Sequence, residues 1–167
     1  DTIDLNEIKE LRKYNCTRVQ LGVQHTDNNV LKKIQRGHTI EQAYNAIKLL
    51  KNNCFKVDIH LMPNLPGSSY EQDQEMLNNA LHNPDLEADQ YKIYPCAVVP
   101  WTKIKQWFDE GSYIPYDDTL LFQLIKDFKI KVQKWKRLNR IIRDIPSSYI
   151  TGGYKEVNMR QLLQNDM

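Results

Sequence analysis

Three short segments carry polar side chains at the ends of runs in which polar and apolar residues alternate. They are Gln24-His25, the stretch from His60 to Gly67, and the stretch from Tyr94 to Pro100. In parallel α/β folds, ligands bind at the carboxyl ends of the strands and in the loops that follow them. The amide, imidazole and phenol groups of these segments are therefore candidates for a ligand site built from three strand ends.

Each of these residues also has a simpler interpretation. Gln24 can cap or brace a loop, and a histidine such as His60 within an apolar strand is commonly a hydrogen-bonded core residue. The Arg-Gly-His-Thr run at 36–39 can be a turn between helices, in which Gly37 supplies a permissive backbone and Thr39 caps the next helix. Residue types and spacing alone leave both interpretations open.

The elements that would position these residues alternate along the chain. A period of two predicts strands at 17–24, 55–62 and 90–94, and an extended segment at 135–145. Apolar residues at helical spacing predict helices at 4–14, 40–52, 69–82, 118–131 and 156–164. Two short helices are also predicted, one that carries Val30, Leu31 and Ile34 and one that carries Ile104, Trp107 and Phe108. Strands separated by helices indicate βαβ units and a parallel sheet.

Three βα units cannot close a barrel, because every barrel strand needs two neighbours. The sheet is therefore either open and doubly wound or part of a larger barrel. We expect residues 1–115 to hold the three βα units. We expect residues 116–167 to add a helix, a basic strand and a final helix to the same domain.

Composition limits the classes of function. The 167 residues carry a net charge of only +2, so the chain is not polybasic overall and any nucleic-acid contact must come from local clustering. Its three cysteines, Cys16, Cys54 and Cys96, form no CxxC pair, which predicts reduced thiols and no metal site. We find no secretory signal and no apolar run of the roughly 20 residues that a membrane helix needs, so we expect no membrane partner and a cytoplasmic location, or a nuclear one in a eukaryote.

Five motifs in register resemble one enzyme family. They are Gly22-Val23-Gln24-His25, Arg-Gly-His-Thr at 36–39, His-Leu-Met-Pro-Asn-Leu-Pro-Gly at 60–67, Lys-Ile-Tyr-Pro at 92–95 and Arg-Asp-Ile-Pro at 143–146. Their order and spacing are similar to those of the catalytic subunit of Elongator, which belongs to the radical S-adenosylmethionine (SAM) enzymes and modifies wobble uridines of tRNA. The Gly-Val-Gln and Leu-Pro-Gly pieces also occur in oxygen-independent coproporphyrinogen oxidases.

The resemblance implies an α/β fold, the C-terminal half of a partial (β/α)6 barrel of the TIM-like type. It implies SAM and a 4Fe–4S cluster as cofactors, acetyl-CoA as a co-substrate, tRNA as the partner, and further Elongator-type subunits as possible partners. The family's reaction is carboxymethylation of uridine C5 from an acetyl donor.

The family's cluster-binding cysteine triplet is absent from this chain, and the resemblance places it upstream of Asp1. The acetyltransferase-like domain would lie downstream of Met167. We therefore expect a fragment that is inactive by itself. Two alternatives stay open: a non-catalytic remnant that binds tRNA or a protein partner, and a radical SAM enzyme of the coproporphyrinogen oxidase type.

The resemblance also assigns individual positions, although it assigns no catalytic residue. Gln24 matches a strand-end glutamine that contacts SAM, and Arg36 matches an arginine whose planar fork suits the methionine carboxylate. The remaining expected cofactor contacts are His60, Tyr94, Cys96 and Ala97. His25 stands where relatives usually have serine, and Asn64 stands where aspartate is common.

A basic segment lies between residues 126 and 143. It comprises Lys126, Lys129, Lys131, Lys134, Lys136, Arg137, Arg140 and Arg143, with Trp135 among them. The segment can be a solvated helix face followed by a charged edge strand. It can also bind RNA, because cationic side chains neutralise phosphates. The family resemblance favours tRNA contacts by Lys136, Arg137, Arg140 and Arg143.

Overall fold

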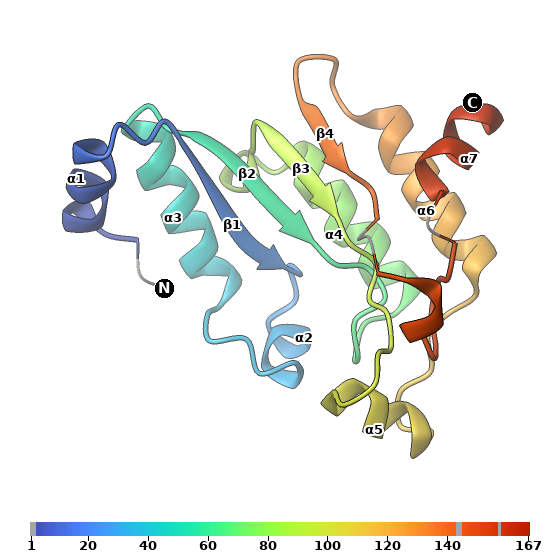
Figure 1. Ribbon diagram of the computed structural model, residues 1–167. Helices are drawn as coiled ribbons and strands as arrows, with labels where there is room; N and C mark the ends of the chain where they lie inside the picture. The colour runs from blue at the N-terminus through green and yellow to red at the C-terminus, as the bar shows by residue number, and fades with distance from the viewer. Residues whose placement is uncertain (1–2, 143–144, 157) are drawn as a thin grey trace.

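Residues 3–142, 145–156 and 158–167 are described by the computed structural model (Figure 1). Within them, one four-stranded parallel sheet has the order β1-β2-β3-β4. The strands are β1 (Arg18–Gln24), β2 (Lys56–Leu61), β3 (Gln90–Ile93) and β4 (Arg137–Arg140). The helices are α1 (Leu5–Lys13), α2 (Asn28–Lys33), α3 (Ile40–Asn52), α4 (Tyr70–His82), α5 (Lys103–Asp109), α6 (Asp118–Lys131) and α7 (Met159–Asp166), with short 3-10 turns η1 (Pro84–Leu86) and η2 (Ser147–Tyr149).

Strand β2 shows how the sequence pattern divides the two faces of the sheet. Val57, Ile59 and Leu61 have no exposed surface and belong to the hydrophobic core. Asp58 and His60 alternate with them, so their side chains point to the opposite face. The alternation that predicted this strand therefore separates an apolar helix-covered face from a polar face.

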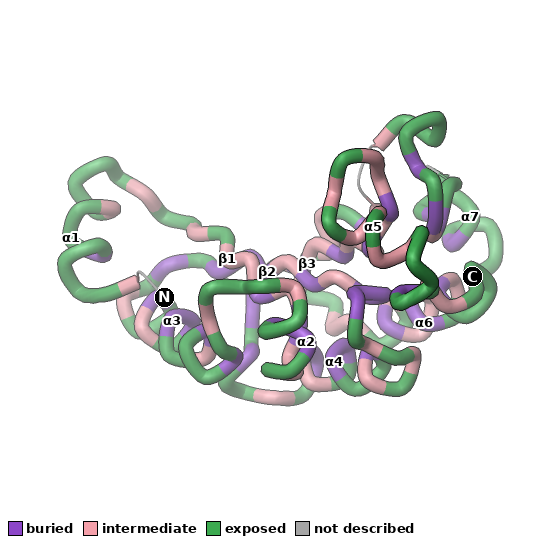
Figure 2. Tube along the Cα trace, turned by 90° about the horizontal axis from the view of Figure 1, so that it is seen from below, coloured by how far each residue is buried: buried purple, intermediate pink, exposed green. Residues whose placement is uncertain are grey.

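The helices that cover the apolar face begin at strong caps. Thr39 opens α3 and Ser69 opens α4, each through a reciprocal capping box with the glutamine three residues later. Figure 2 shows α3, α4 and α6 on the same side of the sheet, with the buried residues between the helices and the strands. Among the described residues, no helix covers the polar face between α1 and α5.

The C-terminal part adds a fourth strand to the three βα units that the sequence predicted. β4 pairs in parallel with β3, so α6 is a crossover helix between them. The predicted extended segment 135–145 is wrong in length, since β4 spans only Arg137–Arg140. The predicted boundary at residue 115 stays a prediction.

Within the described residues, this sheet has an uncovered polar face and two unpaired edge strands. Both features are expected of a section of a barrel, because the remaining barrel strands would pair with those edges. No helix in the described part of the chain is long and apolar enough to cross a membrane.

Candidate cofactor-binding site

Gln24 and Arg36 converge on one glycine at the carboxyl end of β1. The Arg36 Nη2 atom donates to the Gly22 carbonyl oxygen over 2.9 Å. A Cβ atom at Gly22 would lie 2.4 Å from that nitrogen and 2.6 Å from Gln24 Nε2. Because only glycine leaves this space, both polar side chains can lie across the strand. Residues 36–39 therefore connect two helices, which is the simpler of the two interpretations of this run. The same connection also brings the Arg36 guanidinium to the end of β1.

His60 presents a ring nitrogen without a partner on the polar face. Its Nε2 atom is buried and makes no hydrogen bond within the chain, and its ring packs edge-on against Tyr94 with the centroids 5.5 Å apart. Burial, followed by the positive charge of Lys92, holds the pKa of His60 below its ordinary value, although Asp58 opposes the shift. The imidazole is therefore neutral near pH 7, and its unpaired nitrogen suits a hydrogen bond to a ligand.

Asp58, which the sequence interpretation did not single out, organises the polar face beside His60. Its side chain is fully buried, and its Oδ2 atom accepts hydrogen bonds from Gln20 Nε2 and Asn139 Nδ2, each over 3.1 Å. Lys92 Nζ lies 3.7 Å from the same oxygen. The three partners come from β1, β4 and β3, so this carboxylate ties the whole sheet together on that face.

The loop after β3 is held on two sides. The Cys96 N–H donates to the Pro63 carbonyl oxygen over 2.8 Å, and Val98 forms an antiparallel bridge with Gly152. The Cys96 side chain is buried beside Val30 and Leu65. Burial also raises the pKa of its thiol to about 11. The thiol is therefore part of the core, and a ligand could meet only the backbone of this segment.

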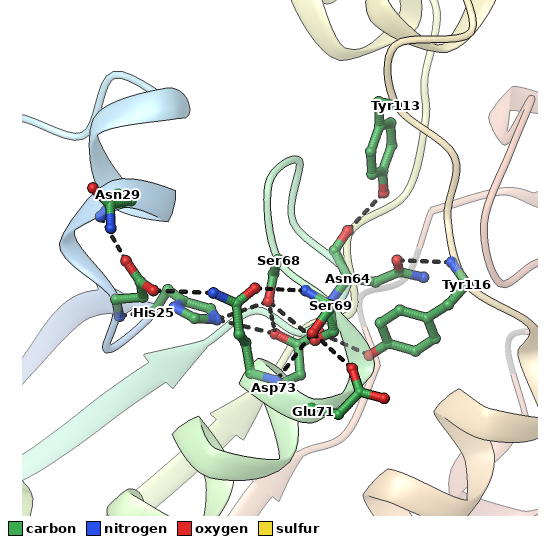
Figure 3. Close-up of polar contacts among 11 residues, drawn as sticks. His25, Asn29, Asn64, Ser68, Ser69, Glu71, Asp73, Tyr113 and Tyr116 are labelled. Carbon is green, nitrogen blue, oxygen red and sulfur yellow. Dashed lines mark hydrogen bonds and ion pairs between the residues drawn. The ribbon is translucent and has the colours of Figure 1, made fainter.

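A second buried carboxylate, Asp73, holds the loop after β2 (Figure 3). Its Oδ1 atom accepts from His25 Nε2 over 3.0 Å and from Ser68 Oγ over 2.7 Å. Its Oδ2 atom accepts from the Asn64 N–H over 2.5 Å and from the Tyr116 hydroxyl over 2.8 Å. Four donors stabilise one carboxylate that is fully buried. The departures from the family at His25 and Asn64 are thus parts of one structural network.

The Ser68, His25 and Asp73 side chains contain the groups of a hydrolytic triad, but their arrangement excludes that role. His25 Nδ1 accepts the Asp27 N–H over 2.9 Å, so the ring proton is on Nε2. Nε2 then donates toward Asp73 and Ser68 and has no lone pair with which to accept the Ser68 proton. The cluster braces the loop and does not activate a nucleophile.

The described residues do not form a binding site for an iron–sulfur cluster. They contain no group of three or more His, Cys, Asp or Glu side chains that could bind a metal. Cys16 is half-buried, Cys54 is exposed and Cys96 is buried, each at a different place in the fold. The described cysteines therefore do not form a ligand set for a 4Fe–4S cluster.

The residues of the basic segment, which the sequence suggested for RNA binding, differ in their exposure. Lys136 points inward: its side chain is 5% exposed, and its Nζ donates to the Tyr91 hydroxyl over 3.1 Å and lies 3.8 Å from Glu87. This placement makes Lys136 unsuited to phosphate binding. Arg137 and Arg140 are exposed at opposite ends of β4, and Arg143 lies outside the described residues.

Comparisons with known proteins identify similar families and relatives. The model of the Radical SAM superfamily matches residues 1–80, and that of the Radical_SAM C-terminal domain matches residues 88–167. The tRNA uridine(34) acetyltransferase of Methanocaldococcus jannaschii is 40% identical over 96% of this chain and 30% of its own length. Elongator complex protein 3 of Saccharomyces cerevisiae is 34% identical over 93% of this chain and 28% of its own length.

A solved structure shows the same fold. The archaeal Elp3 of Methanocaldococcus infernus, with an N-terminal deletion of residues 1–46, matches with a TM-score of 0.92 and 40% identity. The match covers 98% of this chain and 38% of that one. The chain spans less than a third of the two curated relatives named above. The sheet is therefore part of a TIM-like barrel and the chain, which is similar over nearly its whole length to Elongator complex protein 3 and the tRNA uridine(34) acetyltransferases, belongs to the radical SAM superfamily.

Proposed function

We propose that this chain supplies the SAM-binding half of a barrel in an enzyme that modifies C5 of uridine 34 in tRNA by carboxymethylation from an acetyl donor. The observation that carries the proposal is the convergence of Gln24 and Arg36 over Gly22, next to the unpaired His60 nitrogen, at the carboxyl ends of β1 and β2. Ligands bind at this edge of parallel α/β folds.

The residues present fit SAM. The Arg36 fork matches a carboxylate, and the Gln24 amide can both donate and accept. The neutral His60 ring, with Tyr94 packed on its edge, suits the ribose or adenine, and the backbone from Tyr94 to Ala97 can lie along the base. Bound SAM and a reduced iron–sulfur cluster supply the radical chemistry, while these residues bind and orient. The cluster would be held by cysteines outside this chain, and acetyl-CoA would bind in another domain.

For tRNA, the proposal uses the exposed arginines of β4. Arg137 and Arg140, together with Arg143, would contact phosphates, and further Elongator-type subunits would be possible partners. We place the reaction in the cytoplasm, or in the nucleus of a eukaryote, where tRNA is available. Reversing the charge at Arg137 and Arg140 should weaken tRNA binding and reduce its salt dependence by about one unit of slope for each lost contact. The same charge change at exposed Lys48 on α3 is the matched control.

The direct test uses the full-length protein, loaded anaerobically with iron and sulfide. We expect it to cleave SAM to 5′-deoxyadenosine and to bind tRNA. SAM binding measured separately by calorimetry checks the site without depending on turnover. A protein that binds tRNA but neither binds nor cleaves SAM would be the non-catalytic remnant. Cleavage that depends on a porphyrin and not on tRNA would indicate the coproporphyrinogen oxidase type.

A further inference from the structure

Trp101 combines two features that rarely occur together. The residue is 93% exposed, and its backbone is in the left-handed region with φ of 63°. A bulky residue rarely adopts this conformation, which costs free energy relative to glycine. An indole this exposed buries little surface that could offset the strain. The fold itself therefore gains almost nothing from tryptophan at this position.

The backbone on both sides of Trp101 is fixed. The Thr102 hydroxyl donates to the Val99 carbonyl oxygen over 2.8 Å and accepts the Lys105 N–H over 3.2 Å as the N-cap of α5. Upstream, Val98 is bonded in both directions to the segment at 151–152, over 2.9 and 2.8 Å. The loop therefore holds the Trp101 backbone in a set position before any ligand arrives, which lowers the ordering cost of binding.

The same loop sits at the edge that carries the proposed SAM contacts. Ile104, in the first turn of α5, packs against the small apolar cluster of Val30, Leu65 and Cys96. That cluster joins α2, the loop after β2 and the loop after β3. Figure 1 shows α5 and α2 beyond the arrowheads of the strands. Trp101 therefore stands at the rim of the carboxyl edge.

We propose that Trp101 is a stacking platform for an unstacked base of single-stranded RNA. This inference rests on the proposed function, since a base must leave its stack to reach a site at this edge. An exposed aromatic ring stacks on any base. The exposed Lys103 lies two positions along the chain, and its ammonium group can contact the phosphate next to the stacked base. A flat ring beside a cation fits a nucleotide better than the apolar surface of a protein partner.

The experiment measures binding of a labelled anticodon stem–loop with uridine at position 34 to the full-length protein by fluorescence anisotropy. Stacking contributes about 1–3 kcal/mol per base, so Trp101→Ala should weaken binding about tenfold. Trp101→Phe should retain most of the affinity. Tyr14→Ala, which removes another exposed aromatic (81% exposed) from the end of α1, should change it less than twofold. A blunt RNA duplex without a loop should bind all variants equally.

Trp101→Gly separates a binding role from a structural one. Glycine relieves the strained φ, so the thermal midpoint should stay the same or rise while stem–loop affinity falls about tenfold. SAM affinity should not change in any Trp101 variant. Unchanged stem–loop affinity in Trp101→Ala, with a wild type that binds, overturns the stacking role alone. A wild type that binds neither SAM nor the stem–loop overturns the proposed function and the stacking role together.

Discussion

Asp73→Asn is the substitution that most severely tests the hydrogen-bond network that holds the loop after β2. Each carboxylate oxygen of Asp73 accepts two donors: His25 Nε2 and Ser68 Oγ on one, the Asn64 N–H and the Tyr116 hydroxyl on the other. An asparagine has one oxygen and one amide nitrogen, so in either orientation two of the four buried donors lose their acceptor, and one of these two is an N–H group that cannot reverse its role.

The magnitude follows from those two lost bonds. Hydrogen bonds to a charged group contribute about 1.5–3 kcal/mol each, so two of them amount to about 3–6 kcal/mol. Removing a buried charge offsets part of this loss, because a neutral amide costs less to bury. We expect a destabilisation of about 3 kcal/mol, which lowers the melting temperature of a domain of this size by roughly 6–12 °C.

The assay compares Asp73→Asn with Glu75→Gln by denaturant and thermal unfolding. Glu75 is exposed on the same helix, so its substitution removes the same charge without touching the network, and we expect less than about 0.5 kcal/mol. Limited proteolysis should cut the Asp73 variant first within residues 62–69. If the two variants are equally stable, the reasoning from the four donors is wrong.

Three further outcomes follow from the structure. Gly22→Ala should lower SAM affinity at least tenfold with little loss of stability, because the new methyl group takes the space of the neighbouring guanidinium; calorimetry with each variant checks this. Burial raises the pKa of the Tyr113 and Tyr116 phenols above their ordinary value of 10.0. The unfolded chain therefore releases these protons first, and the free energy of unfolding should fall as pH rises above about 10, less steeply in Tyr116→Phe. The buried Cys96 thiol, with its pKa near 11, should react with a thiol reagent at pH 8 only after denaturation, whereas exposed Cys54 should react at once.

The regular elements could be predicted because local patterns determine them. The alternation through β2 and the Thr39 cap of α3 both appear in the structure where the sequence indicated them. The basic strand was predicted, but its parallel pairing with β3 was not, because Arg137 to Arg140 is mostly polar and shows no pattern of a buried parallel strand. Parallel pairing depends on contacts distant in sequence, which periodicity does not report.

The SAM contacts assigned to individual residues stay predictions, whereas the structure adds the residues that support them. The rule about strand ends singled out Gln24 and His60 as candidates, but it did not single out Asp58 or Asp73. Each is an ordinary acidic residue in its own element, and each acquires its role from partners brought together by the fold. One signal was available for Asp58: a carboxylate in the middle of an apolar strand requires a polar face. For Lys136 the local pattern was misleading. It belongs to a basic run that suggested exposure, but its side chain is buried and donates a hydrogen bond to the Tyr91 hydroxyl.

The measurement that tests the central claim most directly is SAM affinity of the full-length protein with Arg36→Lys, by calorimetry and without turnover. Lysine keeps the charge but loses the planar fork, so we predict an affinity at least tenfold weaker than that of the wild type. Arg18→Lys, at the opposite end of β1, is the matched control and should bind SAM as the wild type does. Equal SAM affinity in Arg36→Lys and the wild type would contradict the assignment of this strand end as the SAM site.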